Sequence, residues 1–280
     1  MQKLLLVDGS NLLFQMFYGM PARIFNQDGK AIHGTLGFIG ALLKIIRMTT
    51  PSHVIVLFDG QCHNERKDLN EEYKANRPDY SEIPEEELPF SQEPDIYAAL
   101  DYLKIAHTQT TVCETDDIIA AYALKLSNQI PIVISSFDSD FFQLINDNVC
   151  VLRYRGAQSI VCDKEYIQEK LKINPSQYAD FKSLTGDNAD NIKGAEKVGP
   201  KTAAKLINQF GSLDNLLERT NEIQSETIRK SITDSKERLK VNQLLIRLNE
   251  KADLPFTLER LEFKDSGTTT NEVLRAIGLK

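Results

Sequence analysis

Cysteine and histidine are both scarce in this chain of 280 residues, which has four of each. The cysteines lie 51, 37 and 12 positions apart without any C-x-x-C pair, and the histidines are scattered. Zinc sites and disulfide frameworks require such residues at short, regular spacings. The sequence therefore predicts neither, and the apolar neighbours of Cys113 and Cys150 indicate buried thiols.

Long apolar runs are missing as well. Only four apolar residues in a row precede Asp8, and no later run approaches the roughly 18 residues that a membrane span requires. The hydrophobic fraction of 41% is nevertheless ordinary for a globular chain and supplies a sizeable core. We therefore expect a cytoplasmic protein without membrane contact.

The chain also lacks a surplus of positive charge. Lys and Arg number 33 against 40 Asp and Glu, which gives a net charge of -7 and a pI near 5.3. Proteins that bind nucleic acids usually carry a basic surplus, so this balance argues against such a partner. A metal site that gathers many of the acids would leave the rest of the surface basic and would allow a nucleic-acid partner.

Short β-branched or leucine-rich runs alternate with helical patterns in the first part of the chain. Continuous apolar runs of this length fit strands buried on both faces and joined by helical crossovers. We predict an α/β domain over residues 1–162, with a mostly parallel central sheet and flanking helices. Its predicted strands are residues 3–7, 53–58, 105–110, 130–136 and 149–154.

The pattern becomes helical beyond this domain. Segments with apolar residues at spacings of three and four follow one another, which predicts a helical region over residues 163–250, followed by a tail over 251–280. Residues 77–94, after the second strand, are rich in Pro and Glu. That composition predicts a mobile excursion over the sheet edge.

Carboxylates are concentrated where the predicted strands end. The carboxyl ends of parallel strands share one edge of a sheet, and a helix that follows a strand begins at that edge. In the segment TGDNADN, two further acids three positions apart could face one way on a helical turn. The nine acids concerned are Asp8, Asp59, Glu114, Asp116, Asp117, Asp138, Asp140, Asp187 and Asp190.

For any single one of these acids, a turn or helix cap is the simpler interpretation, and Thr115 or Asp116 could serve as such a cap. Nine acids gathered near one sheet edge are better explained by bound cations. An all-oxygen donor set suits Mg²⁺ or Mn²⁺, and two such ions about 4 Å apart recur in phosphodiester hydrolysis. Removing the nine charges takes the net charge from -7 to +2, so the acidic balance is largely this predicted site.

A first basic segment, NEEYKANRP, follows the second strand and precedes the excursion. It contains Tyr73, Lys74 and Arg77, and a cation there could reach a phosphate held by the metals. An ordinary solvated turn explains the same charges equally well on local grounds.

A second basic segment, IKGAEKVGPKTAAKLINQFGS, has Gly194 and Gly199 in a tight turn before a helix opened by Pro200. Free N–H groups at such a helix start suit a phosphate. A solvated helix face explains the lysines but not the glycines, so the segment indicates a clamp on a DNA backbone. Its lysines recur every four residues, at Lys193, Lys197, Lys201 and Lys205.

Together these segments resemble the 5′-nucleases of the flap endonuclease or 5′-3′ exonuclease family, specifically stand-alone bacterial relatives of the 5′-nuclease domain of DNA polymerase I. The matching stretches, in the family's order from residue 3 to about 218, are LLLVDGSNLLFQMFY, VLFDG, RKDLNEEYKANRP, ETDDIIAAYA, SSFDSDFFQLI and LTGDNADNIKGAEKVGPKTAAKLINQFGSL. The resemblance implies an arch over about residues 60–92 and a helix-three-turn-helix region. It also implies two Mg²⁺ or Mn²⁺ ions and a K⁺ ion at the hairpin turn.

The resemblance assigns roles to individual residues. Lys74 matches the family's phosphate-facing lysine, Arg77 a neighbouring substrate-contacting position, and Asp117 a carboxylate that acts through water. The implied metal ligands form a first cluster of Asp8, Asp59, Glu114 and Asp116 and a second cluster of Asp138, Asp140, Asp187 and Asp190. The expected DNA contacts are Arg66, Tyr73, Gly194, Lys197, Gly199, Lys201 and Lys205.

Two positions depart from the family pattern. Ser139 stands where many relatives have lysine, and Lys197 stands where many have a third glycine, so a backbone with positive φ would be costlier there.

The expected activity is cleavage of DNA near 5′ flap junctions during primer removal and repair, by a monomer whose substrates include RNA-containing 5′ ends. Two alternatives remain open at this point: a module that binds DNA junctions without cutting, and a metal-dependent RNase specific for single strands.

Overall fold

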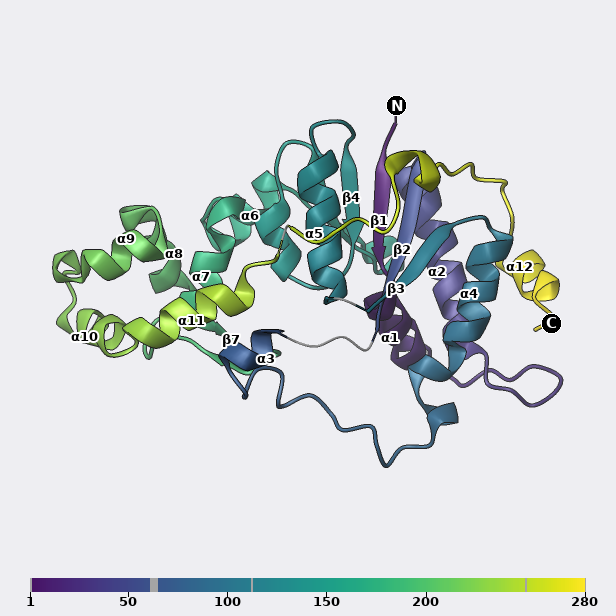
Figure 1. Ribbon diagram of the computed structural model, residues 1–280, viewed down its shortest axis with the longest axis horizontal. Helices are drawn as coiled ribbons and strands as arrows, with labels where there is room; N and C mark the ends of the chain where they lie inside the picture. Colours follow the sequence, from purple (N-terminus) through teal and green to yellow (C-terminus); the bar gives the residue numbers. More distant parts are fainter. Residues whose placement is uncertain (1, 61–64, 112, 250, 280) are drawn as a thin grey trace.

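A computed structural model describes residues 2–60, 65–111, 113–249 and 251–279 (Figure 1). Residues 61–64, at the start of the expected arch, lie outside the described part. An α/β domain occupies one side of the molecule and a group of helices the other. Within the described residues, no helix has the length and apolar character needed to cross a membrane.

The predicted sheet is confirmed. Six strands lie in the order β3-β2-β1-β4-β5-β6, and all pairs are parallel except the last, in which β6 runs antiparallel to β5. The strands are β1 (Leu4–Asp8), β2 (His53–Asp59), β3 (Ala106–Thr110), β4 (Ile132–Ser135), β5 (Val149–Arg153) and β6 (Ile160–Cys162). The continuous apolar runs fit because both faces of the central strands are covered.

Successive residues of β1 face opposite sides of the sheet, as the pleat requires. Leu5 and Val7 join an apolar cluster with α1, α2 and α4, whereas Leu4 and Leu6 join another with α5 and the helical region. The helices are α1 (Gly9–Gly19), α2 (His33–Thr49), α4 (Glu93–Tyr102) and α5 (Thr115–Leu126).

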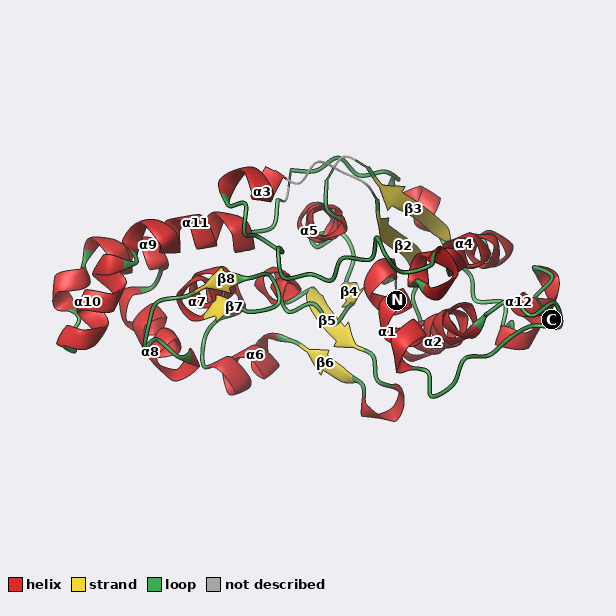
Figure 2. Ribbon diagram, turned by 90° about the horizontal axis from the view of Figure 1, so that it is seen from below, coloured by secondary structure: helices red, strands yellow, loops and turns green. Residues whose placement is uncertain are grey.

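Between residues 163 and 249 the described chain contains six α-helices, gathered at one end of the molecule (Figure 2). They are α6 (Lys164–Leu171), α7 (Tyr178–Thr185), α8 (Pro200–Phe210), α9 (Leu213–Glu218), α10 (Glu226–Asp234) and α11 (Lys236–Ile246). Asp187 and Asp190 do not lie on a helical turn, the arrangement that would have let both acids face one way. They lie in a small antiparallel hairpin formed by β7 (Gly186–Asp187) and β8 (Ile192–Lys193).

The described part of the expected arch, residues 65–92, runs along the lower edge of Figure 1 toward α4. It contains α3 (Glu65–Leu69) and two 3₁₀ turns, Glu85–Glu87 and Pro89–Gln92. Aromatic contacts attach its far end to α1, since the ring of Phe14 lies 5.3 Å from that of Phe90 and 6.5 Å from that of Tyr80.

The C-terminal segment, expected as a tail, packs against the α/β domain. It returns from α11 past α5, where the Tyr122 hydroxyl donates to the carbonyl of Phe256 at 2.8 Å. Near the C-terminus, α12 (Thr270–Ala276) packs against α2 and α4 through the buried side chains of Val273 and Leu274. This segment therefore connects the helical region to α2 and α4 of the α/β domain.

Candidate active site

The sheet topology brings the predicted acids together. Asp8 and Asp59 are the last residues of β1 and β2, and Asp138 and Asp140 follow β4. Because β2, β1 and β4 are neighbours in the sheet, their carboxyl ends form one continuous edge. Glu114 is the residue before α5, which starts at the same edge. Its side chain makes no cap hydrogen bond, so the capping interpretation does not apply to it.

Two serines that the sequence reasoning missed hold the first cluster. The Ser136 hydroxyl donates to Asp8 Oδ2 at 2.8 Å and accepts the backbone N–H of Asp138 at 3.0 Å. Ser10 Oγ accepts the backbone N–H of Asp59 at 2.8 Å. Both serines adjoin the predicted ligands in the motifs DGSN and SSFDSD, and that proximity was the available signal.

The buried acids of the first cluster raise one another's pKa. Burial, with the neighbouring charge of Asp59, raises the pKa of Asp8 to about 7. Burial and the charges of Asp138, Asp8 and Asp59 raise the pKa of Asp116 well above its ordinary value. Carboxylates placed this close can all ionise only when a cation lies among them.

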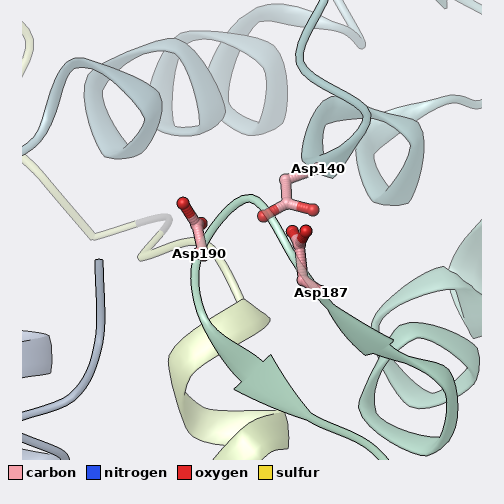
Figure 3. Close-up of side chains that lie close together, drawn as sticks. All are labelled: Asp140, Asp187 and Asp190. Atoms are coloured by element: carbon pink, nitrogen blue, oxygen red, sulfur yellow. The ribbon is translucent and has the colours of Figure 1, made fainter. Parts of the chain in front are cut away.

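The second cluster is compact. One carboxylate oxygen from each of Asp140, Asp187 and Asp190 lies within 4.8 Å of the other two. Figure 3 shows Asp187 and Asp190 on the hairpin turn, with Asp140 directed toward them from the loop after β4. The hairpin needs glycine at Gly186 and Gly194, since a Cβ on Gly194 would lie 2.4 Å from the carbonyl oxygen of Leu184. Gly194 therefore shapes the hairpin that carries two of the acids.

Lys182 is a further residue of the second cluster that the sequence reasoning missed. Its ammonium group pairs with Asp140 and lies 2.6 Å from Asp187 Oδ2. Burial opposes this charge, but the two carboxylates hold the pKa of Lys182 above its ordinary value. A single lysine within the otherwise buried run of α7 was the signal for it. A divalent ion here would share the carboxylates with Lys182 or displace it.

Two cations from the arch reach the carboxylates. Lys74 Nζ lies 2.6 Å from Glu114 Oε1, and its side chain is 10% exposed. Burial opposes ionisation of Glu114, but Lys74 and Arg66 outweigh it and lower the pKa of that carboxyl. Arg77 lies 3.2 Å from Asp190, with more than half of its side chain in solvent. Lys74 and Arg77 are thus placed at the two clusters.

Arg66 and Asp117 are joined inside the protein. The guanidinium of Arg66 contacts Asp117 through two nitrogens, at 2.7 and 3.1 Å, and also pairs with Glu114. It donates to the carbonyl of Leu245 at the end of α11 as well. Asp117 accepts the backbone N–H of Asn249. Arg66 therefore connects the arch, the first cluster and the helical region, and its contacts are with protein groups rather than at an open surface.

Replacing Arg66 with Met is expected to lower the free energy of unfolding by about 3 kcal/mol, because it leaves buried carboxylates without their partner. Chemical denaturation with and without Mg²⁺ measures this loss. Lys164→Met is the matched control, since Lys164 pairs with Asp147 at the surface and should contribute at most about 1 kcal/mol. Equal losses in the two variants would contradict this role of Arg66.

Tyr73 is not placed to contact DNA. It is 3% exposed and packs against Ala179, Ile192 and Leu245, which attaches the arch to the helical region. The expectation that it binds DNA is therefore not supported by its position, and its aromatic ring has a packing role here.

The four predicted lysines do not form one helical row, because only Lys201 and Lys205 lie on α8, whereas Lys193 lies in β8 and Lys197 in the turn before the helix. Lys193, Lys197, Lys201 and Lys205 are all exposed. Lys197 has φ of 61°, so the left-handed conformation that glycine adopts easily is present at a lysine. Gly199 precedes α8 with φ of -83° and open space around it. Glycine is therefore not required there by geometry.

The residues at the sheet edge fit divalent cations. Their donors are carboxylate oxygens, without a thiol or imidazole in the two clusters, and hard ions such as Mg²⁺ and Mn²⁺ prefer such donors. The raised pKa values of Asp8 and Asp116 show the charge that these ions would neutralise. The predicted first cluster (Asp8, Asp59, Glu114 and Asp116) would hold one ion, and the predicted second cluster (Asp138 with the compact group Asp140, Asp187 and Asp190) the other.

Stabilisation by Mg²⁺ is expected to increase as the pH rises from 6 to 8. An unfolded Asp titrates near pH 4, whereas burial raises the pKa of Asp8 and of Asp140 to about 7. Between about pH 4 and 7 the folded protein thus binds protons that the unfolded chain does not, and the stability that these protons provide is lost as the pH rises through 7. Above pH 7 both carboxylates are ionised in the folded protein, so Mg²⁺ binds without displacing protons and stabilises the fold more. Calorimetry should show the Tm difference between Mg²⁺ and EDTA widening by about 5 °C. An unchanged difference would contradict the assignment.

Comparison with known proteins follows the same division of the chain. A model of the 5′-3′ exonuclease N-terminal resolvase-like domain matches residues 3–172, and one of the 5′-3′ exonuclease C-terminal SAM fold matches residues 173–269. DNA polymerase I of Rhizobium leguminosarum is 35% identical over 264 residues, which are 91% of this chain and 25% of that protein. The 5′-3′ exonuclease of Aquifex aeolicus is 29% identical over 265 residues, covering 94% of this chain and 88% of that protein.

Solved structures show the same fold. The bacteriophage T5 D15 protein crystallised with metal ions has a TM-score of 0.72 at 22% identity, over 89% of this chain and 90% of its own. The T5 D15 flap endonuclease in complex with DNA and metal ions gives 0.72 at 21% identity, over 99% of both chains. The catalytic core of Rad2 with DNA substrate gives 0.61 at 17%, over 99% and 93%.

Proposed function

Because this chain belongs to the 5′-3′ exonuclease family, we propose that it hydrolyses phosphodiesters of branched DNA near the junction of a 5′ single-stranded flap and duplex. The observation that carries this proposal is the juxtaposition of the two carboxylate clusters with Lys74 and Arg77. Two Mg²⁺ or Mn²⁺ ions would supply an attacking water of lowered pKa and neutralise charge on the phosphate.

The protein's own residues orient the scissile phosphate. Lys74 is held at the first cluster by Glu114, and its charge would stabilise the negative charge that develops on the phosphate. Arg77 has the exposure to meet the neighbouring phosphate. Ser136 fixes Asp8 and the start of the Asp138 loop, so the donors keep their geometry when a ligand arrives.

The helical region would hold the duplex. The N-terminus of α8 has no side-chain cap, so its first N–H groups can bind a phosphate oxygen. Lys193 in β8, Lys197 in the turn before α8, and Lys201 and Lys205 on α8 are exposed and would contribute the positive charge that backbone contacts require. Contacts of this kind position a duplex without reading its sequence.

The test uses a labelled double-flap DNA, with and without Mg²⁺, beside the same labelled strand alone. Cutting near the junction that depends on metal is the expected result. Binding without cutting would favour a junction-binding module, and equal cutting of the free single strand would favour a general or RNA-directed nuclease. Parallel substrates with an RNA 5′ end test the proposed action on primers.

The remaining expectations stay proposals and have their own measurements. These are a monomer, which light scattering would show, a cytoplasmic location, and a K⁺ ion at the turn before α8. Cleavage and duplex binding that do not change when Na⁺ replaces K⁺ would argue against that ion.

A further inference from the structure

The base of the arch, residues 72–77, lies against the turn of the acidic hairpin, residues 187–191, although more than 100 positions separate them in the sequence. Two side-chain amides cross between these segments. Asn76 Nδ2 donates to the carbonyl of Asn188 at 2.7 Å, and Asn191 Nδ2 donates to the carbonyl of Glu72 at 2.8 Å. Each segment therefore supplies one amide and receives one.

Backbone contacts lie within the same region. The N–H of Lys74 donates to the carbonyl of Asp190 at 3.0 Å. Lys74 and Asn191 both have left-handed backbones, with φ of 58° and 57°. Non-glycine residues keep this conformation when surrounding contacts fix it, and a lysine does so at some cost. We name this set of three hydrogen bonds the arch latch.

The arch latch fixes groups that belong to both clusters. The backbone of Lys74 is held by its hydrogen bond to Asp190, and its ammonium group lies against Glu114 of the first cluster. Asp190, whose carbonyl accepts the Lys74 N–H, offers its carboxylate to the second cluster and to Arg77. The two asparagine amides are engaged with backbone carbonyls, so they orient these groups without being metal ligands themselves.

Given the proposed function, we propose that Asn76 and Asn191 are positioning residues that fasten the base of the arch to the acidic hairpin. Lys74 and the second cation site then form one rigid unit before DNA arrives. Removal of the two amides should leave the chain folded, because Asn76 is exposed and each bond contributes about 1 kcal/mol. It should loosen both the cation site and Lys74.

The test compares the double variant Asn76→Ala/Asn191→Gly with the wild type. Glycine at 191 keeps the positive φ, so only the amide is removed. Asn148→Ala is the matched control, since this exposed amide also donates to a distant carbonyl, that of Ser127 at 2.9 Å, away from the site. Thermal unfolding in EDTA should show both variants folded.

Two readouts are expected to change. Mn²⁺ titrated alone into DNA-free protein should bind about 10-fold more weakly to the double variant, and single-turnover cleavage of the flap should be about 10-fold slower. The Kd for DNA should stay within about 2-fold, since the phosphate contacts of α8 are untouched. The control variant should match the wild type in all three. Unchanged Mn²⁺ affinity and cleavage would overturn the proposal.

A double-mutant cycle separates positioning from general weakening. In a Lys74→Gly background, with Mn²⁺ saturating for every variant, removing the two amides should slow cleavage little further, because saturation compensates for the weakened cation site and leaves only the effect through Lys74. A full additional 10-fold loss there would overturn the coupling. Failure of the wild type to cut any flap would reject the proposed function alone, since Mn²⁺ affinity still tests the latch without DNA.

Discussion

Replacing Asp138 and Asp140 with Asn is expected to abolish cleavage while DNA binding persists. The substitution removes two of the four acids predicted for the second cluster, including Asp140, which lies with Asp187 and Asp190 in the carboxylate group that would hold a divalent ion. Metal-based stabilisation of a phosphoryl transition state is worth several kcal/mol, so the rate should fall by about 10³-fold or more.

The same variant should keep its affinity for flap DNA, because the proposed duplex contacts lie on α8 and the preceding turn. Lys182 retains Asp187 as a partner, so the chain should remain folded. Asp147→Asn is a suitable control, since that acid is exposed and pairs with Lys164 outside the site. Gel shifts in Ca²⁺ and single-turnover cleavage in Mg²⁺ measure the two properties. Substantial cutting by the double variant would show that the second cluster is dispensable.

Replacing Lys74 with Gly is expected to reduce the single-turnover rate by about 10²- to 10³-fold, the effect of removing one positioned donor from a developing negative charge. Glycine keeps the positive φ of 58°, so the loss reports the ammonium group rather than backbone strain. Cleavage at saturating DNA should fall much more than affinity, since one phosphate contact among several contributes little to binding.

Two further variants, Lys74→Arg and Arg77→Ala, test whether the effect depends on the shape of the cation and on its position. Arginine keeps the charge but changes its shape and reach, so partial activity is expected. Arg77 is more exposed than Lys74 and should contribute less. An affinity loss as large as the rate loss would mean that Lys74 binds the ground state rather than the transition state.

Local patterns in the sequence were sufficient for the sheet and for the location of most acids. The continuous apolar runs at residues 3–7, 53–58 and 130–136 predicted strands buried on both faces, because only a covered parallel sheet can bury such runs completely. The same reasoning placed Asp8, Asp59 and Asp138 at one edge, since parallel strands end together. These features depend on neighbours along the chain.

Contacts between distant segments could not be read in this way. Arg66 and Tyr73 carry the residue types of a nucleic-acid contact, yet Arg66 is paired with Asp117 and Tyr73 is buried. Lys182 sits in an ordinary helical pattern, and only the folded chain places its ammonium group between Asp140 and Asp187. Side-chain type limits what a residue can contact, but the tertiary structure selects the partner.

The sequence by itself therefore determined the α/β architecture and the carboxylate donor chemistry of the sheet edge, because each follows from residue type and local spacing. The tertiary structure alone decided which cations pair with which carboxylates. It also decided that Asp187 and Asp190 lie in a hairpin rather than on a helical turn, and that Asn76 and Asn191 join the arch to that hairpin. The physical reason is range: a hydrogen bond or ion pair requires contact within about 3 Å, and only folding brings residues more than 100 positions apart to that distance.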